Sequence, residues 1–191
     1  PKDANVIRNK PDVLFYFTGL TRVDQLETNT YVPGALADHL TSFGGALKPK
    51  GGGQMSILRW LEAGAAGSYG TATEPCNYTA KFPDTRVLVP TYFRGSTLIE
   101  AYWKSVKWPG EGVFAGDPLA RPWGSTVELA GGTLTIRTTS LEPSRSYTLK
   151  GRRSAGGALE TVQSGITVDA PRLHVITVSP VEHVAYELVP D

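Results

Sequence analysis

The sequence is poor in cysteine and in charge. Cys76 is the only cysteine among 191 residues, so the chain cannot close a disulfide within itself. The formal net charge is +1, which gives no electrostatic reason to expect binding to nucleic acid or to an anionic membrane surface. No apolar run is long enough to span a bilayer. These absences predict a globular protein with one thiol, which is either free or paired with another chain.

The first two thirds of the chain mix apolar runs with helical patterns. Residues 12–17 (DVLFYF) are a continuous apolar run, which predicts a central parallel strand buried on both faces. The other elements expected before Pro122 are strands at 34–40 and 65–73, helices at 54–63, 87–93 and 97–106, and a short strand or loop at 113–119. This succession predicts an α/β domain with a mainly parallel sheet over residues 1–121.

After Pro122 the apolar residues recur with period two. Six short strands are expected, at 126–129, 133–138, 147–150, 159–162, 173–178 and 185–189. Turns rich in glycine, proline and serine separate them. Regularly spaced short strands predict a small β-sandwich of immunoglobulin-like kind over residues 122–191.

His39 and Cys76 are the first candidate site. His39 lies near the end of one predicted strand and Cys76 just past the next. Parallel strands joined by a helix end at the same edge of a sheet, where α/β proteins form their sites. A cysteine and a histidine at that edge can form a nucleophile and its base. The alternative is that His39 holds a loop while Cys76 is buried or disulfide-bonded.

Asp38, His39 and Ser42 are a second candidate cluster, because an acid, an imidazole and a hydroxyl lie within five residues. Neighbouring residues of a strand point to opposite faces, which opposes a relay between Asp38 and His39. The alternative is that Asp38 and Ser42 accept hydrogen bonds from the Gly44–Gly45 turn.

No cofactor or metal is expected from the remaining motifs. The glycines at 51–53 precede a predicted helix, but the lysine and hydroxyl of a phosphate-binding loop do not follow them. Glu74 and Asp84 flank Cys76 in sequence without a nearby histidine or an Asp-x-Asp repeat, so no metal site is predicted.

Five segments before Gly124 have a distinctive sequence: ADHLTSFGG (37–45), MSILRWLEAGAAGSYGT (55–71), EPCN (74–77), GSTLIEAYWKSV (95–106) and GVFAGDPLARPW (112–123). In these segments residues 12–123 resemble an uncharacterised family of exported bacterial proteins. More distantly, the helix, the small-residue strand and the G-x-T-L-x-E-A segment resemble the C-terminal half of the caspase, gingipain and CHAT peptidase domain. In that alignment Thr18-Gly19 replaces the catalytic His-Gly, and Thr41 or Ser42 replaces the catalytic cysteine.

The resemblance implies that the N-terminal half of such a domain, with two strands and a helix, precedes Pro1. Either a second polypeptide supplies that half as a partner, or it is a further portion of the same chain. It also implies cysteines in that half, so Cys76 is a candidate for an interchain disulfide in an extracellular or periplasmic compartment. Two functions follow as hypotheses. One is an exported interaction protein on a degenerate caspase-like fold, and the other is a cysteine peptidase that uses His39 and Cys76.

Overall fold

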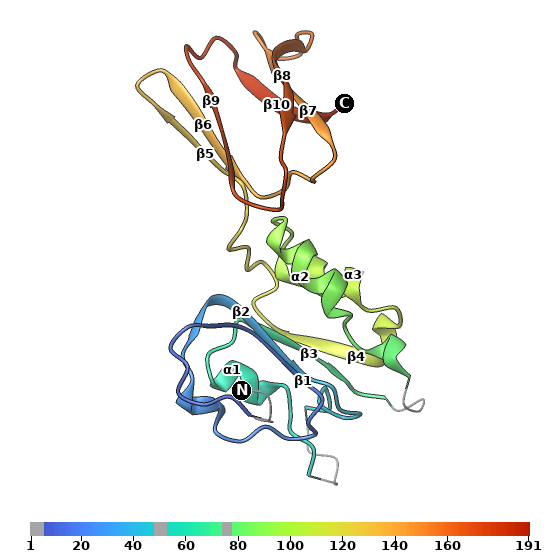
Figure 1. Cartoon of the computed structure of the whole chain (residues 1–191). Coiled ribbons are helices and arrows are strands. Elements are labelled where there is room, and N and C mark those ends of the chain that lie inside the picture. The colour runs from blue at the N-terminus through green and yellow to red at the C-terminus, as the bar shows by residue number, and fades with distance from the viewer. Residues whose placement is uncertain (1–5, 48–52, 74–77) are drawn as a thin grey trace. The chain divides into compact units, whose positions relative to one another are not determined.

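The computed structural model describes residues 6–47, 53–73 and 78–191. The chain forms two compact units (Figure 1). Unit 1 comprises residues up to Tyr92 together with Ser96–Pro122, and unit 2 comprises Phe93–Gly95 together with Trp123–Asp191.

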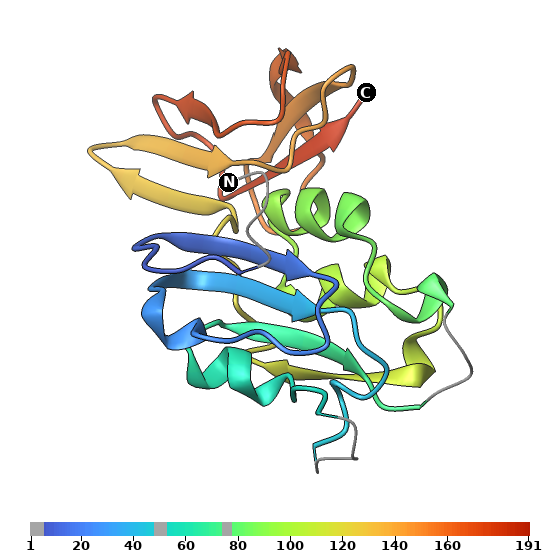
Figure 2. The ribbon, with the colours of Figure 1, turned by 60° about the horizontal axis from the view of Figure 1, so that its bottom comes forward.

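Unit 1 contains a four-stranded sheet in the order β1-β2-β3-β4 (Figure 2). Its strands are β1 (Val13–Thr18), β2 (Tyr31–His39), β3 (Gly67–Thr71) and β4 (Gly112–Gly116). The β1–β2 and β2–β3 pairs are parallel, whereas β3 and β4 are antiparallel. The unit is therefore α/β with a mixed sheet.

The predicted central position of the first strand is wrong for the described residues, because β1 lies at the edge of the sheet. Val13 and Tyr16 are buried, but Phe15 and Phe17 are only half-buried. The apolar run predicts a strand that is covered on both faces, but one face of β1 is only partly covered.

Helices lie on both faces of this sheet (Figure 1). Helix α1 (Leu58–Glu62) covers one face, and α2 (Thr85–Phe93) and α3 (Leu98–Ser105) cover the other. A capping box between Thr97 and Glu100 starts α3. Three short 3-10 helices complete the unit: η1 (Leu26–Thr28), η2 (Thr79–Lys81) and η3 (Pro109–Glu111).

Helix α1 is shorter than the helix predicted over 54–63. The amides of Met55 and Ile57 donate to the carbonyls of Thr21 and Gly44, at 2.9 Å each. These bonds to distant loops replace the local bonds of a helical turn, so the helix begins only at Leu58.

Strand β2 supplies both layers of the unit with buried side chains. Ala35 and Ala37 belong to the apolar cluster that includes Trp60 of α1. Asp38 points to the other face, where it contacts Tyr102 of α3. Successive residues of a strand alternate between faces, so Asp38 and His39 lie in different layers.

Unit 2 consists of two three-stranded antiparallel sheets, in the orders β5-β6-β9 and β10-β7-β8. Its strands are β5 (Thr126–Ala130), β6 (Thr133–Thr138), β7 (Ser146–Arg152), β8 (Glu160–Thr167), β9 (His174–Val178) and β10 (Ala185–Pro190). All six strands predicted after Pro122 are present. Ile176 of one sheet and Leu149 and Ile166 of the other share a core cluster, so the two sheets pack against each other.

Candidate functional site

His39 ends β2 with both ring nitrogens engaged inside unit 1. Nε2 donates to the carbonyl oxygen of Met55 at 2.7 Å, and Nδ1 accepts the indole N–H of Trp60 at 3.0 Å. The residue is 1% exposed, and burial lowers the pKa of its imidazole. The ring is therefore a neutral tautomer with no free nitrogen, and in this arrangement it cannot take a proton from a nucleophile.

Asp38 lies on the opposite face in a buried hydrogen-bond network. Its carboxylate accepts from the Ser68 hydroxyl at 2.9 Å, the Tyr69 amide at 2.7 Å and the Tyr102 hydroxyl at 3.1 Å. Burial raises the pKa of Asp38 to about 7, and these donors partly oppose the rise. The network ties β2 to β3 and α3, so a structural role accounts for all its contacts.

The predicted cluster of Asp38, His39 and Ser42 does not form a relay. Asp38 and His39 have the separate partners described above, and Ser42 offers its backbone carbonyl to the Thr71 hydroxyl at 2.8 Å. The expectation that Asp38 accepts from the Gly44–Gly45 turn is also wrong, because its backbone donor is Tyr69. Sequence spacing did not indicate this donor, which lies 31 residues away.

Cys76 lies outside the described residues. Its pairing with His39 and its part in an interchain disulfide therefore stay predictions. Among the residues that the structure describes, no group of three or more His, Cys, Asp or Glu side chains is arranged to hold a metal ion. In the same part of the chain, no helix has the length and apolar character needed to cross a bilayer.

A groove of about 530 Å³ runs along β1 at the edge of the sheet in unit 1. Its lining includes the apolar side chains of Ile7, Phe15, Phe17 and Leu20. The two phenylalanine rings stack with centroids 6.3 Å apart. A groove beside an edge strand is a place where another polypeptide can bind.

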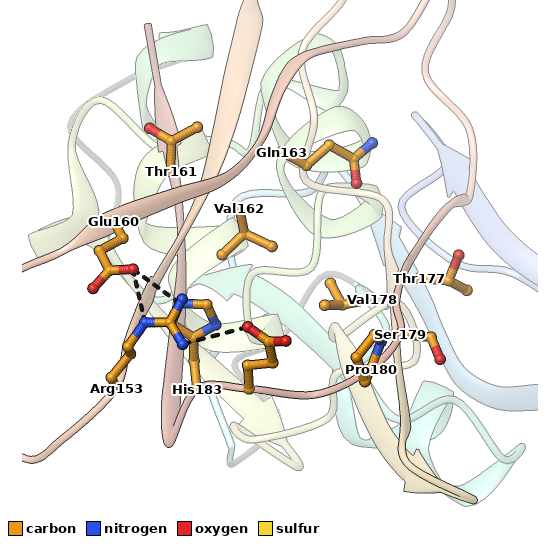
Figure 3. Close-up of a pocket in the computed structure, with 11 residues that line it drawn as sticks. Arg153, Glu160, Thr161, Val162, Gln163, Thr177, Val178, Ser179, Pro180 and His183 are labelled. Carbon is orange, nitrogen blue, oxygen red and sulfur yellow. Dashed lines mark hydrogen bonds and ion pairs between the residues drawn. The ribbon is translucent and has the colours of Figure 1, made fainter.

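Unit 2 holds a second cavity, of about 410 Å³, between β8 and the end of β9 (Figure 3). Arg153 reaches two carboxylates there, Glu160 at 3.0 Å and Glu182 at 3.3 Å. Val162 of β8 and Val178 of β9 are among its apolar lining residues (Figure 3). No motif of the sequence indicates this cavity, because its charged residues come from three separate segments.

His183 closes one end of that cavity. Its side chain is 9% exposed, and Nε2 lies 3.7 Å from the Glu160 carboxylate, beyond hydrogen-bonding distance. Neither ring nitrogen has a hydrogen-bond partner among the described residues. The ring packs on β7 at Gly151, where a Cβ atom would lie 2.5 Å from the imidazole Cγ.

The Gly151→Ala substitution is expected to lower the free energy of unfolding of unit 2 by about 1–3 kcal/mol, because the added methyl group overlaps the His183 ring. Chemical denaturation monitored by circular dichroism measures the change. In a His183→Ala background the same glycine substitution should cost much less. An equal cost in both backgrounds would show that His183 is not the obstacle.

No family model, no curated protein and no solved structure matches this chain.

Proposed function

We propose that the chain is an interaction protein on a degenerate caspase-like fold, and that unit 1 binds a second polypeptide along β1. The observation that carries the proposal is the edge position of β1 beside a groove lined by Phe15 and Phe17. An edge strand offers backbone donors and acceptors to an added strand, and alternate side chains give the contact its specificity.

The side chains of β1 favour an apolar partner on one face. Phe17 is in register with Asp38, so both lie on the face that α2 and α3 cover. The helices reach over β2, where Tyr102 contacts Asp38, but Phe17 stays half-buried. A partner strand that extends the sheet past β1 would bury the rest of the Phe17 ring. Burial of apolar surface is favourable in free energy, so it would stabilise the complex.

Thr18 and either Thr41 or Ser42 are aligned with the catalytic histidine and cysteine of the peptidase superfamily. The contacts of the two threonines support a fold that has lost this catalytic pair. The Thr18 hydroxyl accepts from the Leu20 amide at 3.3 Å, and the Thr41 hydroxyl donates to Gln54 Oε1 at 2.7 Å. Both hydroxyls therefore hold neighbouring loops. Together with the engaged ring of His39, this arrangement favours binding over hydrolysis.

The proposed partner is the N-terminal half of the same kind of domain, from the same precursor. The proposal includes an extracellular or periplasmic location, where Cys76 can form a disulfide with a cysteine of that half. This follows from the family resemblance, and the edge strand is compatible with it.

Coexpression of the chain with that N-terminal half as a separate polypeptide tests the proposal. We expect a one-to-one complex by size-exclusion chromatography with light scattering. The Phe17→Asp substitution should weaken it at least tenfold, because a charge would be buried at the new strand pair.

Val87→Asp is the matched control, since Val87 lies on α2 of the same unit and is already 39% exposed. It should leave the complex unchanged. Failure to form a complex, or equal weakening by both substitutions, would contradict binding along β1.

A further inference from the structure

Two apolar side chains on β5 face the interior of the sandwich and yet are exposed to solvent. Val127 is in register with Ile136, and Leu129 with Leu134. Directly opposed residues of an antiparallel pair share a face, and Ile136 packs against the core of unit 2. Val127 is nevertheless 66% exposed and Leu129 64% exposed. We call these two side chains the core-facing strip.

The strip is exposed because the opposite sheet stops short of it. The cavity of Figure 3 is lined by both β8 and β9, so these two edge strands lie on the same side of the sandwich. The other edge strands, β5 and β10, must then share the opposite side. β10 ends its sheet on that side and keeps one backbone edge unpaired, and the exposure of Val127 and Leu129 shows that it does not cover β5.

The core-facing strip itself carries no charge. The only charged residue of β5 is Glu128, which points away from the strip and lies 3.4 Å from Arg137 on β6. On β10, the side chains that pack against the core, Tyr186 and Leu188, are also uncharged. A second copy would therefore bring no like charge against the strip.

We propose that a second copy of this chain fills the space, with the β5 strand of each copy lying beside β10 of the other. A two-fold axis parallel to the strands then places the two core-facing strips against each other. In one layer, the sheet β5-β6-β9 of the first copy continues into the sheet β10-β7-β8 of its partner. In the other layer, the sheet β10-β7-β8 of the first copy continues into β5-β6-β9 of the partner. Each contact occurs twice, as a two-fold interface requires.

This inference is independent of the proposed binding along β1, because it involves only strands of unit 2. It also explains why β5 has Val and Leu at alternate positions although it adds no residue to the core cluster of its own unit. The β5 strand of a second copy would pair with the free edge of β10 and would also cover the exposed apolar side chains.

Sedimentation equilibrium of the full chain tests the proposal. We expect a reversible dimer, which Val127→Asp and Leu129→Asp each weaken at least tenfold, since either buries a charge against the partner's strip. Val175→Asp is the control, because Val175 is 48% exposed on the same sheet but is in register with Arg137, on the outer face. A monomeric wild-type chain, or a dimer that Val127→Asp leaves intact, would overturn the proposal.

Crosslinking provides a second test in case the aspartate variants fail to fold. Facing sheets lie about 10 Å apart, so a short bismaleimide should join two copies that carry Val127→Cys in a Cys76→Ser background. The same reagent should not join copies that carry Val175→Cys. Equal crosslinking of both variants would exclude the proposed arrangement. A complex that forms only with an unrelated strand-forming polypeptide would also refute the two-copy interface.

Discussion

Replacing His39 by alanine is expected to lower the free energy of unfolding of unit 1 by about 3–5 kcal/mol. The substitution leaves a cavity beside Trp60, and it deprives the indole N–H of Trp60 and the carbonyl of Met55 of their partner. Each buried group left without a partner costs about 1–3 kcal/mol, in addition to the lost packing. Denaturant unfolding followed by tryptophan fluorescence measures the loss.

Two further variants test whether the lost stability comes from the contacts of His39. Trp60→Phe keeps most of the packing but removes the donor to Nδ1, so it should cost less than His39→Ala. His174→Ala, on β9 of unit 2, should leave the stability of unit 1 unchanged. A His39→Ala protein that is as stable as the wild type but has lost a hydrolytic activity would refute the structural role and restore the peptidase hypothesis.

The stability of unit 1 is expected to fall as the pH rises from about 4 to about 7, because of Asp38. Burial raises the pKa of its carboxyl from 3.8 to about 7 in the folded chain. The folded state therefore binds this proton more tightly than the unfolded state, so the contribution is complete below the unfolded pKa and is lost as pH rises through the folded one. At about 1.4 kcal/mol per pKa unit, the loss is of the order of 4 kcal/mol.

The Asp38→Asn variant should lack this pH dependence, because the amide keeps the shape of the carboxyl but does not titrate. The measured quantity is the difference in unfolding free energy between wild type and variant at several pH values. Asp169→Asn is the control, since the Asp169 side chain is 74% exposed. If the wild type and the Asp38→Asn variant have the same pH profile, Asp38 is not the titrating group.

Local patterns in the sequence predicted the elements that depend on local physics. The strands of unit 2 were predicted because period-two segments are separated by glycine-rich turns. Helices α2 and α3 were predicted as well, and the capping box at Thr97 shows why α3 begins where it does. These features need only residues close together in the chain.

Long-range contacts could not be predicted in the same way. Asp38 meets Ser68 and Tyr102, which are 30 and 64 residues further along the chain. The edge position of β1 depends on which strand lies beside it, and an apolar run alone does not show this. The juxtaposition of His39 and Cys76 remains a prediction.

The segment that follows β2 packs its backbone against the end of β3. The Thr71 hydroxyl donates to the carbonyls of Thr41 and Ser42, and the Gly45 amide donates to the Thr71 carbonyl at 2.8 Å. A Cβ atom on Gly70 would lie only 2.4 Å from the Gly45 nitrogen. In open α/β sheets this is the edge where ligands bind, and here the Gly45 backbone lies against the end of β3. An engineered site at the end of β3 would thus have to displace this loop, because any side chain at Gly70 overlaps its backbone.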